Sequence, residues 1–153
     1  MARMEDLVET EQEHMRSLAL NTFDTTPWAE GPPLSERRVA IVTTAGLSLR
    51  DEAAFGLGAA DYRVIPAAAD TADILMNHVS VNFDRTGFQD DVNIVFPIDR
   101  LREMAADGEI GSVADFHYSF MGATDPALLE DSARALAGML REDQVNAVIL
   151  TPV

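Results

Sequence analysis

Residues 39 to 46 read Val39-Ala40-Ile41-Val42-Thr43-Thr44-Ala45-Gly46, a short run of β-branched residues that ends in small ones. A continuous apolar run of this length is typical of a strand that is buried on both faces. Such strands occur mostly in parallel sheets that are covered by helices. The run therefore predicts the central strand of an α/β domain.

Further strand patterns alternate with helical ones along the rest of the chain. Strands are expected at 62–66, 110–120 and 145–153, and helices at 4–20, at 97–106 and after the capping residue Thr124 or Asp125. The last helix should bury one face, formed by Leu128, Leu129, Ala133, Leu136, Ala137 and Leu140. Residues 70–76 fit a helix or a strand, and 86–93 form a polar loop. The alternation predicts a mostly parallel sheet flanked by helices on both faces, Rossmann-like or flavodoxin-like, with an incomplete last βα unit.

The length of 153 residues fits one compact domain. Residues 1–33 are expected to form an N-terminal helix and a turn-rich connector, and residues 34–153 the α/β domain itself. The final strand should be buried. Left without a covering helix, it would expose apolar surface and cause marginal stability or self-association.

Charge and cysteine content exclude several classes of function. The formal net charge is -15, which repels nucleic acid and anionic membranes, and no stretch is long and apolar enough to span a bilayer. We therefore expect a cytoplasmic protein. The chain has no cysteine, hence no disulfide, thiolate metal site or thiol nucleophile.

Ligands of parallel α/β sheets bind beyond the carboxyl ends of the strands. Three segments should meet there. The candidate residues are Thr43, Thr44 and Gly46, then Tyr118, Ser119 and Gly122, and finally the strand tip Thr151, Pro152 and Val153. The small residues Thr43, Thr44 and Gly46 let a ligand approach, and the hydroxyls of Tyr118 and Ser119 could face the pocket; close packing between elements explains these residues equally well.

The remaining polar candidates are His78, Asp84, Asp91, Asn93 and Arg63. His78 could donate a proton or ligate a metal, with a carboxylate that orients its ring. Alternatively, Asp91 and Asn93 cap a turn before the helix at Pro97, and His78 hydrogen-bonds the loop. Arg63 could bind a substrate carboxylate or serve as a surface ion-pair partner. The pattern is no standard metal signature, so no metal is expected.

Taken together, these segments carry a family resemblance that covers about residues 34–153. The segments are Val39-Ala40-Ile41-Val42-Thr43-Thr44-Ala45-Gly46-Leu47, Asp61-Tyr62-Arg63-Val64-Ile65-Pro66, His78, Asp91-Val92-Asn93-Ile94-Val95-Phe96-Pro97-Ile98-Asp99-Arg100-Leu101-Arg102-Glu103, Gly108-Glu109-Ile110-Gly111, Tyr118-Ser119-Phe120-Met121-Gly122 and Val148-Ile149-Leu150-Thr151-Pro152-Val153. Their order and spacing resemble the glycine/sarcosine/betaine/D-proline reductase family, specifically its selenoprotein B-type proteins. The family pattern includes His78, Asp91 and Asn93 more clearly than Asp84.

The resemblance implies an oxidoreductase that reductively cleaves a carbon–heteroatom bond, with a selenolate or thiolate as nucleophile and a disulfide as acceptor. In such proteins the closing segment runs into selenocysteine or cysteine, which here would follow Val153. Because selenocysteine is encoded by UGA, our hypothesis is that the chain is the truncated product of a selenoprotein gene. The chain itself then holds no cofactor and is expected to be inactive.

The expected partners are a small-molecule substrate, a thioredoxin-like redox protein for the full-length form, and a second copy in a homo-oligomer. Two other functions remain open. One is a non-catalytic ligand-binding or assembly module that uses the same pocket. The other is a metal-assisted hydrolase built on His78, Asp84 and Asp91.

Overall fold

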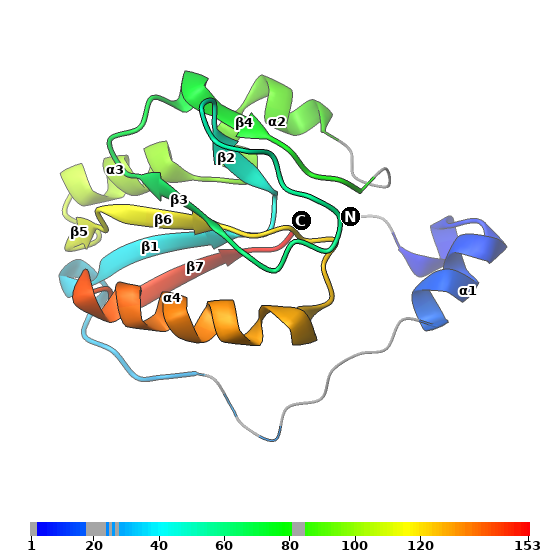
Figure 1. The fold of residues 1–153 in the computed structure, drawn as a ribbon. Coiled ribbons are helices and arrows are strands. Elements are labelled where there is room, and N and C mark those ends of the chain that lie inside the picture. Colours follow the sequence, from blue (N-terminus) through cyan, green and yellow to red (C-terminus); the bar gives the residue numbers. More distant parts are fainter. Residues whose placement is uncertain (1–2, 18–23, 25, 27, 81–84) are drawn as a thin grey trace.

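The main sheet forms the centre of the computed structural model, which describes residues 3–17, 24, 26, 28–80 and 85–153. Its strands are β1 (Arg38–Thr43), β3 (Arg63–Pro66), β5 (Ser112–Val113), β6 (Phe116–Ser119) and β7 (Ala147–Thr151). Strand β1 pairs in parallel with β5, β6 and β7, and β3 pairs antiparallel with β6. The fold is thus α/β with a mixed, mostly parallel sheet (Figure 1), as predicted at this level.

The strand predicted at 110–120 is interrupted between β5 and β6. Residue Ala114 still pairs with β1 through its N–H, which donates to the Val39 carbonyl at 2.9 Å. The N–H of Ile41 instead donates to Nδ1 of His117 at 3.0 Å. The His117 imidazole thus replaces a backbone acceptor at the break, which keeps a buried donor satisfied.

Two core clusters lie against the sheet, and each includes a different helix. Helix α3 (Ile98–Ala106) contributes Ile98 and Leu101 to a cluster with Val39 and Ile41 of β1. Helix α4 (Glu130–Glu142) contributes Leu136 to a cluster with two aromatic residues that follow along β6 and its end, Tyr118 and Phe120. Helix α3 begins after Pro97 and is followed by Gly108 at φ 73°, which confirms the predicted helix and its stop.

Helix α4 buries a narrower stripe than the pattern predicted. The carboxylate of Asp125 caps the preceding short 3-10 helix η5 (Pro126–Leu129) by accepting from the Ala127 N–H at 2.9 Å. Because η5 has three residues per turn, the α-helical spacing does not extend back through it, and Leu128 is 59% exposed. Ala133 and Ala137 are exposed as well. The expected burial of these three residues was wrong.

Residues 86–93, predicted as a loop, form helix α2 (Thr86–Asp90) and the start of a 3-10 helix, η4 (Val92–Ile94). The loop prediction was wrong because Phe88 and Val92 pack against the core and fold the polar residues between them into helical turns. Asp91 caps η4 by accepting from the Asn93 N–H at 2.9 Å.

A small second sheet was not predicted. The ambiguous stretch 70–76 forms a 3-10 helix, η3 (Thr71–Asp73), and then β4 (Ile74–Met76), which pairs antiparallel with β2 (Leu47–Leu49). Gly46, at φ 66°, allows the chain to turn from β1 into β2. His78 follows β4 after a single residue, so the small sheet helps to position it.

Strand β7 was predicted to be buried, but it is partly exposed. Val148, Ile149 and Leu150 are 40%, 37% and 72% exposed. In the described part of the chain, β7 pairs only with β1, so its other edge faces outward. An apolar sequence alone does not reveal whether a strand lies at the centre or at the edge of a sheet.

The N-terminal region is peripheral, as expected. The single helix predicted at 4–20 is divided, however, into a 3-10 helix, η1 (Met4–Asp6), and helix α1 (Glu9–Ser17), neither of which has buried residues. A further 3-10 helix, η2 (Leu34–Glu36), lies at the start of the predicted α/β domain. Figure 1 shows α1 standing away from the sheet. Residues 18–20 of the predicted helix lie outside the described residues.

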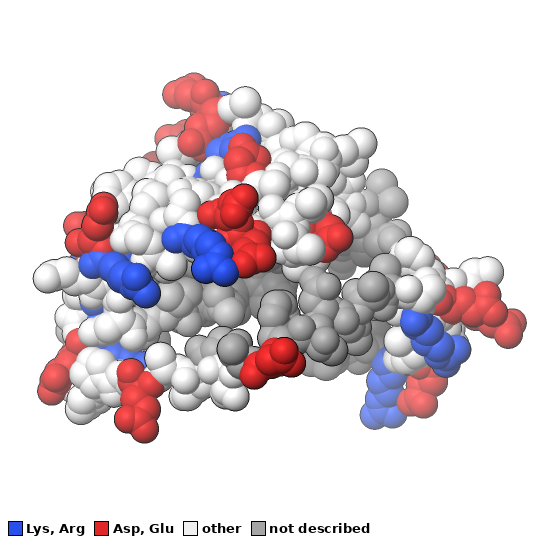
Figure 2. Space-filling model, turned by 60° about the horizontal axis from the view of Figure 1, so that its bottom comes forward, with Lys and Arg blue, Asp and Glu red and all other residues white. Residues whose placement is uncertain are grey.

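Basic side chains on the face in Figure 2 lie next to acidic ones and do not gather into a patch. Among the described residues, ion pairs such as Arg134–Glu130 and Arg50–Asp73 join basic side chains to acidic ones. Among the residues that the structure describes, no helix has the length and apolar character needed to cross a membrane.

Candidate functional site

The carboxyl ends of β1, β6 and β7 meet, as the sequence predicted. Beyond these ends, the Gly46 N–H donates to the Phe120 carbonyl and the Gly122 N–H to the Thr44 carbonyl, both at 2.9 Å. Thr44 also holds Val153: the Val153 N–H donates to Thr44 Oγ1 at 2.8 Å, and the hydroxyl donates to the Val153 carbonyl at 3.3 Å. We call this pair of bonds the Thr44–Val153 clamp.

Gly122 lies where no larger residue fits. A Cβ atom at this position would lie 2.5 Å from the Val153 carbonyl oxygen, 2.8 Å from the Thr44 carbonyl oxygen and 3.1 Å from Nε2 of His78. The three groups therefore surround one α-carbon. Gly46 is similarly enclosed, because a Cβ there would approach the Met121 methyl group at 2.9 Å and the His78 backbone at 3.1 Å.

His78 is therefore part of the same site as the strand ends. Its side chain is 5% exposed, and Nδ1 accepts a hydrogen bond from the Ser80 N–H at 3.2 Å. In the neutral ring this arrangement places the proton on Nε2, the atom nearest to Gly122. Burial lowers the pKa of His78, and the charge of Arg85 lowers it further. The ring is thus neutral near pH 7.

Two residues that hold His78 in place were missed in the sequence. Arg85 donates through its guanidinium to the carbonyl of His78 and, at 3.3 Å, to that of Ser80. Asn77 donates its N–H to the Gly46 carbonyl at 2.8 Å and its side-chain amide to Ser48 Oγ at 2.5 Å. Neither residue belongs to a recognisable motif, and only their proximity to His78 along the chain could have drawn attention to them.

The other candidates at this edge have hydrogen bonds within the protein. Thr43 Oγ1 donates to the Thr151 carbonyl at 3.3 Å and accepts from the Ala45 N–H at 3.2 Å. Ser119 Oγ accepts from the Leu47 N–H at 2.7 Å. These hydroxyls fix the strand ends. Pro152 follows Thr151 within the segment that the clamp holds. Contact of any of them with a substrate stays a prediction.

Tyr118 and Arg63 have different surroundings from the strand-end residues described above. The Tyr118 side chain is buried, stands edge-to-face with Tyr62 and lines a cavity of about 300 Å³ beside α4. Arg63 forms an ion pair with Asp61 at 2.6 Å, and its guanidinium lies 4.3 Å from the centre of the Phe55 ring. This geometry matches the ion-pair alternative for Arg63.

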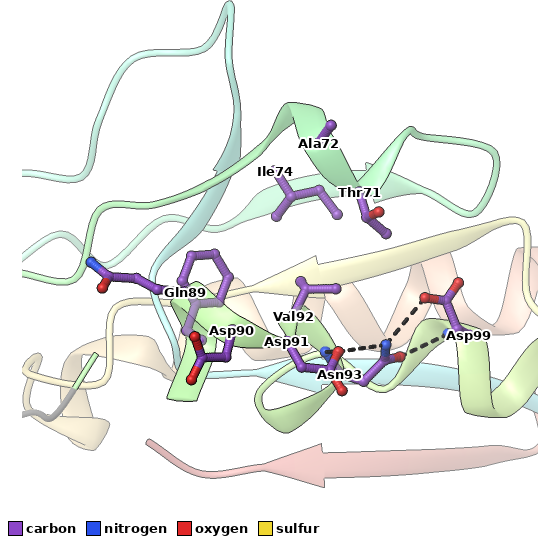
Figure 3. A pocket seen from close by; sticks show the side chains of 10 residues that line it. Thr71, Ala72, Ile74, Gln89, Asp90, Asp91, Val92, Asn93 and Asp99 are labelled. Carbon is purple, nitrogen blue, oxygen red and sulfur yellow. Dashed lines mark hydrogen bonds between the residues drawn. The ribbon is translucent and has the colours of Figure 1, made fainter. Parts of the chain in front are cut away.

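Asp91 and Asn93 line a second, polar cavity of about 420 Å³ between α2, η3 and the start of α3. Figure 3 shows the Asn93 amide between two carboxylates: it donates to Asp91 at 2.8 Å and to Asp99 at 3.1 Å. Asn93 Oδ1 also accepts from the Asp99 N–H at 3.0 Å. Hydrogen bonds from Asn93 lower the pKa of both carboxylates. The structure thus matches the capping alternative for Asp91 and Asn93.

The described residues contain no preformed metal site. Within the ranges that the structure describes, no three His, Asp or Glu side chains lie close enough together to hold an ion. Asp84, the third residue of the hydrolase hypothesis, lies outside the described residues.

Comparison with known proteins identifies the family. The family described as glycine/sarcosine/betaine reductase selenoprotein B matches residues 9–153. The chain belongs to this family. No solved structure gives a significant match.

Curated relatives of the selenoprotein B family include three with different named substrates. D-proline reductase subunit gamma of Acetoanaerobium sticklandii is 34% identical over 121 residues, which cover 77% of this chain and 49% of the relative. Glycine reductase complex component B subunit gamma of Carboxydothermus hydrogenoformans is 31% identical, over 77% of this chain and 28% of the relative. Sarcosine reductase complex component B subunit beta of Peptoclostridium acidaminophilum is 29% identical, with the same coverage. The chain spans about half or less of the length of these selenoprotein B relatives, which are named as subunits of reductases or reductase complexes.

Proposed function

We propose that this chain belongs to an oxidoreductase of the glycine/sarcosine/betaine/D-proline reductase type, in which it forms part of the substrate pocket. The reaction is reductive cleavage of a carbon–heteroatom bond, in which a selenol or thiol and a second thiol supply two electrons and become a selenenyl sulfide or disulfide that a dithiol then reduces. The observation that supports this most directly is the convergence of His78, Gly122 and the Thr44–Val153 clamp at the carboxyl edge of the sheet.

The residues present at this edge fit a redox group. A selenol or thiol would supply the nucleophile, and because the chain has no cysteine, that group has to come from outside residues 1–153. Gly122 brings the Val153 backbone and His78 Nε2 close together, since a Cβ on its α-carbon would lie 2.5 Å from the Val153 carbonyl oxygen and 3.1 Å from Nε2. Among the described residues, the atoms closest to that position are backbone carbonyl oxygens and a neutral imidazole nitrogen.

In this proposal His78 is the proton donor of the reaction. Its neutral ring donates a hydrogen bond through Nε2, either to an anion at the strand end or to the heteroatom that leaves the substrate. An anion next to the ring raises the pKa of His78 and favours the imidazolium, which then protonates the leaving heteroatom. Arg85 and the Ser80 N–H keep the ring oriented for this step.

Activity of an extended protein tests the proposal. The chain is joined to the family's downstream segment with cysteine in place of selenocysteine, and dithiol-dependent turnover of glycine, sarcosine, betaine and D-proline is measured. We expect turnover of at least one, and a drop of about 100-fold in His78→Gln, as is usual when a general acid is lost. Absence of turnover and of thiol reactivity would refute the reductase proposal. Reading the codon after Val153 and the frame beyond it tests the selenoprotein hypothesis separately.

A non-catalytic binding module is the second candidate, favoured by the absence of cysteine from the 153 residues. Titration calorimetry of the unextended chain with the same four compounds tests it. Binding that is lost in Gly122→Ala, together with no turnover by the extended protein, would favour the module over the reductase.

The proposal also includes finer points of fold and partners. We assign the sheet to the Rossmann-like or flavodoxin-like class with helices on both faces, supported by the separate clusters that contain α3 and α4. A thioredoxin-like protein is the proposed reductant of the disulfide, and the cytoplasm is the proposed location.

A further inference from the structure

Arg85 places a positive charge beside the candidate site. Its Nη2 group donates to the His78 carbonyl and, at 3.3 Å, to the Ser80 carbonyl. Burial lowers the pKa of His78 most, and the charge of Arg85 lowers it further, so this charge is close enough to act on the ring. The cation and the buried imidazole therefore belong to one site.

The hydrogen bonds of Arg85 leave part of its guanidinium for a ligand. Among the described residues both bonds start from Nη2, whereas the guanidinium also carries N–H donors on Nη1 and Nε. In the same part of the chain no ion pair joins Arg85 to a carboxylate. Arg63 and Arg102, by contrast, pair with Asp61 and Asp99.

The compounds considered for the proposed function share one anionic group. Glycine, sarcosine, betaine and D-proline each have a carboxylate on the carbon that also carries the nitrogen. The chain has a net charge of -15 and so repels anions over most of its surface. A carboxylate therefore needs a local cation, and the guanidinium of arginine is the side-chain group that best matches it in charge and hydrogen bonding.

We propose that Arg85 binds the carboxylate of the substrate through the donors that lie outside its two carbonyl bonds. This assignment rests on the proposed function. The role of carboxylate binding that the sequence suggested for Arg63 thus passes to Arg85, because Arg63 is already paired with Asp61 at 2.6 Å and also donates to the Ala53 carbonyl.

A carboxylate on Arg85 orients the substrate relative to His78. The His78 carbonyl accepts from Arg85, and Nε2 of the same residue lies nearest to Gly122. In each of the four compounds the carbon–nitrogen bond is next to the carboxylate, so this bond is held close to His78. The bound carboxylate also offsets the charge of Arg85, which removes one cause of the low pKa of His78 and favours its protonated, proton-donating form.

Binding of matched acids and amides tests the assignment. The extended protein, with cysteine in place of selenocysteine, is titrated calorimetrically with the four acids and with the carboxamide of each, which lacks the negative charge. We expect Arg85→Gln to weaken binding of the acids at least tenfold and to leave that of the amides unchanged. Arg85→Lys keeps the charge and should retain more acid binding than Arg85→Gln.

Arg141→Gln is the matched control, because Arg141 is an exposed arginine in the last turn of α4 and its loss changes the net charge equally. Binding of the acids should be the same in this variant as in the unchanged protein.

Each other outcome has a distinct meaning. Acid binding that survives in Arg85→Gln would overturn the role of Arg85 and leave the reductase proposal intact. Equal weakening of acids and amides would also overturn it, because Arg85 would then act through the orientation of His78 or pair with a carboxylate from outside residues 1–153. If the unchanged protein bound none of the four acids, both proposals would be contradicted.

Discussion

The two ends of the main sheet are built from different chemistry. At the amino end Arg38 forms ion pairs with Asp143 and, at 3.1 Å, with Asp115, and it also donates to the Val113 carbonyl at 2.8 Å. At the carboxyl end the contacts are uncharged: two glycines, a hydroxyl and a buried neutral histidine. The charged end joins β1, β5 and the residues before β7, whereas the neutral end packs Gly122 closely against two backbone carbonyl groups and His78. We infer that the first serves stability, and the proposed function assigns the reaction to the second.

The largest effect is expected at the neutral end, from Gly122→Ala. The added Cβ would meet two backbone carbonyl oxygens at 2.5 and 2.8 Å, which cannot rotate away as side chains do. We expect a loss of about 3 kcal/mol or more in the free energy of unfolding, measured with urea. The matched control is Gly138→Ala on α4, where no atom lies within 4 Å of the added Cβ. This change should stabilise by about 0.5–1 kcal/mol, since alanine favours a helix. Equal effects of the two changes would contradict the tight packing at Gly122.

Removal of Arg38 tests the charged end. Arg38→Met leaves the Asp143 carboxylate, 11% exposed, without its cation, and we expect a loss of about 3 kcal/mol in urea unfolding. Asp115→Asn, on the 74% exposed partner, should cost less than about 1 kcal/mol. The NMR titration of His78 should be unchanged in Arg38→Met and altered in Gly122→Ala. A changed His78 titration in Arg38→Met would show that the two ends are not independent.

His117, between the two ends, gives the sheet a pH dependence. Burial lowers its pKa from 6.5 to about 4, which corresponds to about 3 kcal/mol. Because the unfolded chain binds more protons between these values, this stability is complete above pH 6.5 and is lost as pH falls to 4. His78, whose pKa is also lowered, acts in the same direction.

Urea unfolding at pH 8, 6, 5 and 4 measures this effect. His117→Asn can still accept from the Ile41 N–H but does not titrate, so the decrease toward pH 4 should become smaller in this variant. A decrease as steep as that of the unchanged chain would assign the pH dependence to other groups.

Local patterns were enough to predict β1, α3 and the meeting of three segments at the carboxyl edge. Pro97 and Gly108 mark the limits of α3 in the sequence itself, and parallel topology alone brings Gly46, Gly122 and Val153 to one edge. The clamp and the bond from Ile41 to His117 could not be predicted, because each joins residues far apart in sequence. Their register depends on how strands pair in three dimensions. The exposure of β7 was not predicted for the same reason, because its apolar sequence is that of a central strand.

The smallest effect is expected from Thr44→Val, which keeps the shape of the side chain and removes the hydroxyl. The Val153 N–H then loses its acceptor, and we expect a loss of about 1 kcal/mol in urea unfolding. Amide hydrogen exchange at Val153 should become faster, while Thr44→Ser, which retains the hydroxyl, should keep the slow rate. If Thr44→Val left the exchange rate of Val153 unchanged, the strand tip would be held by β1 pairing alone. The neutral end would then differ from the charged end in packing only, and Gly122 rather than Thr44 would position the residue that follows Pro152.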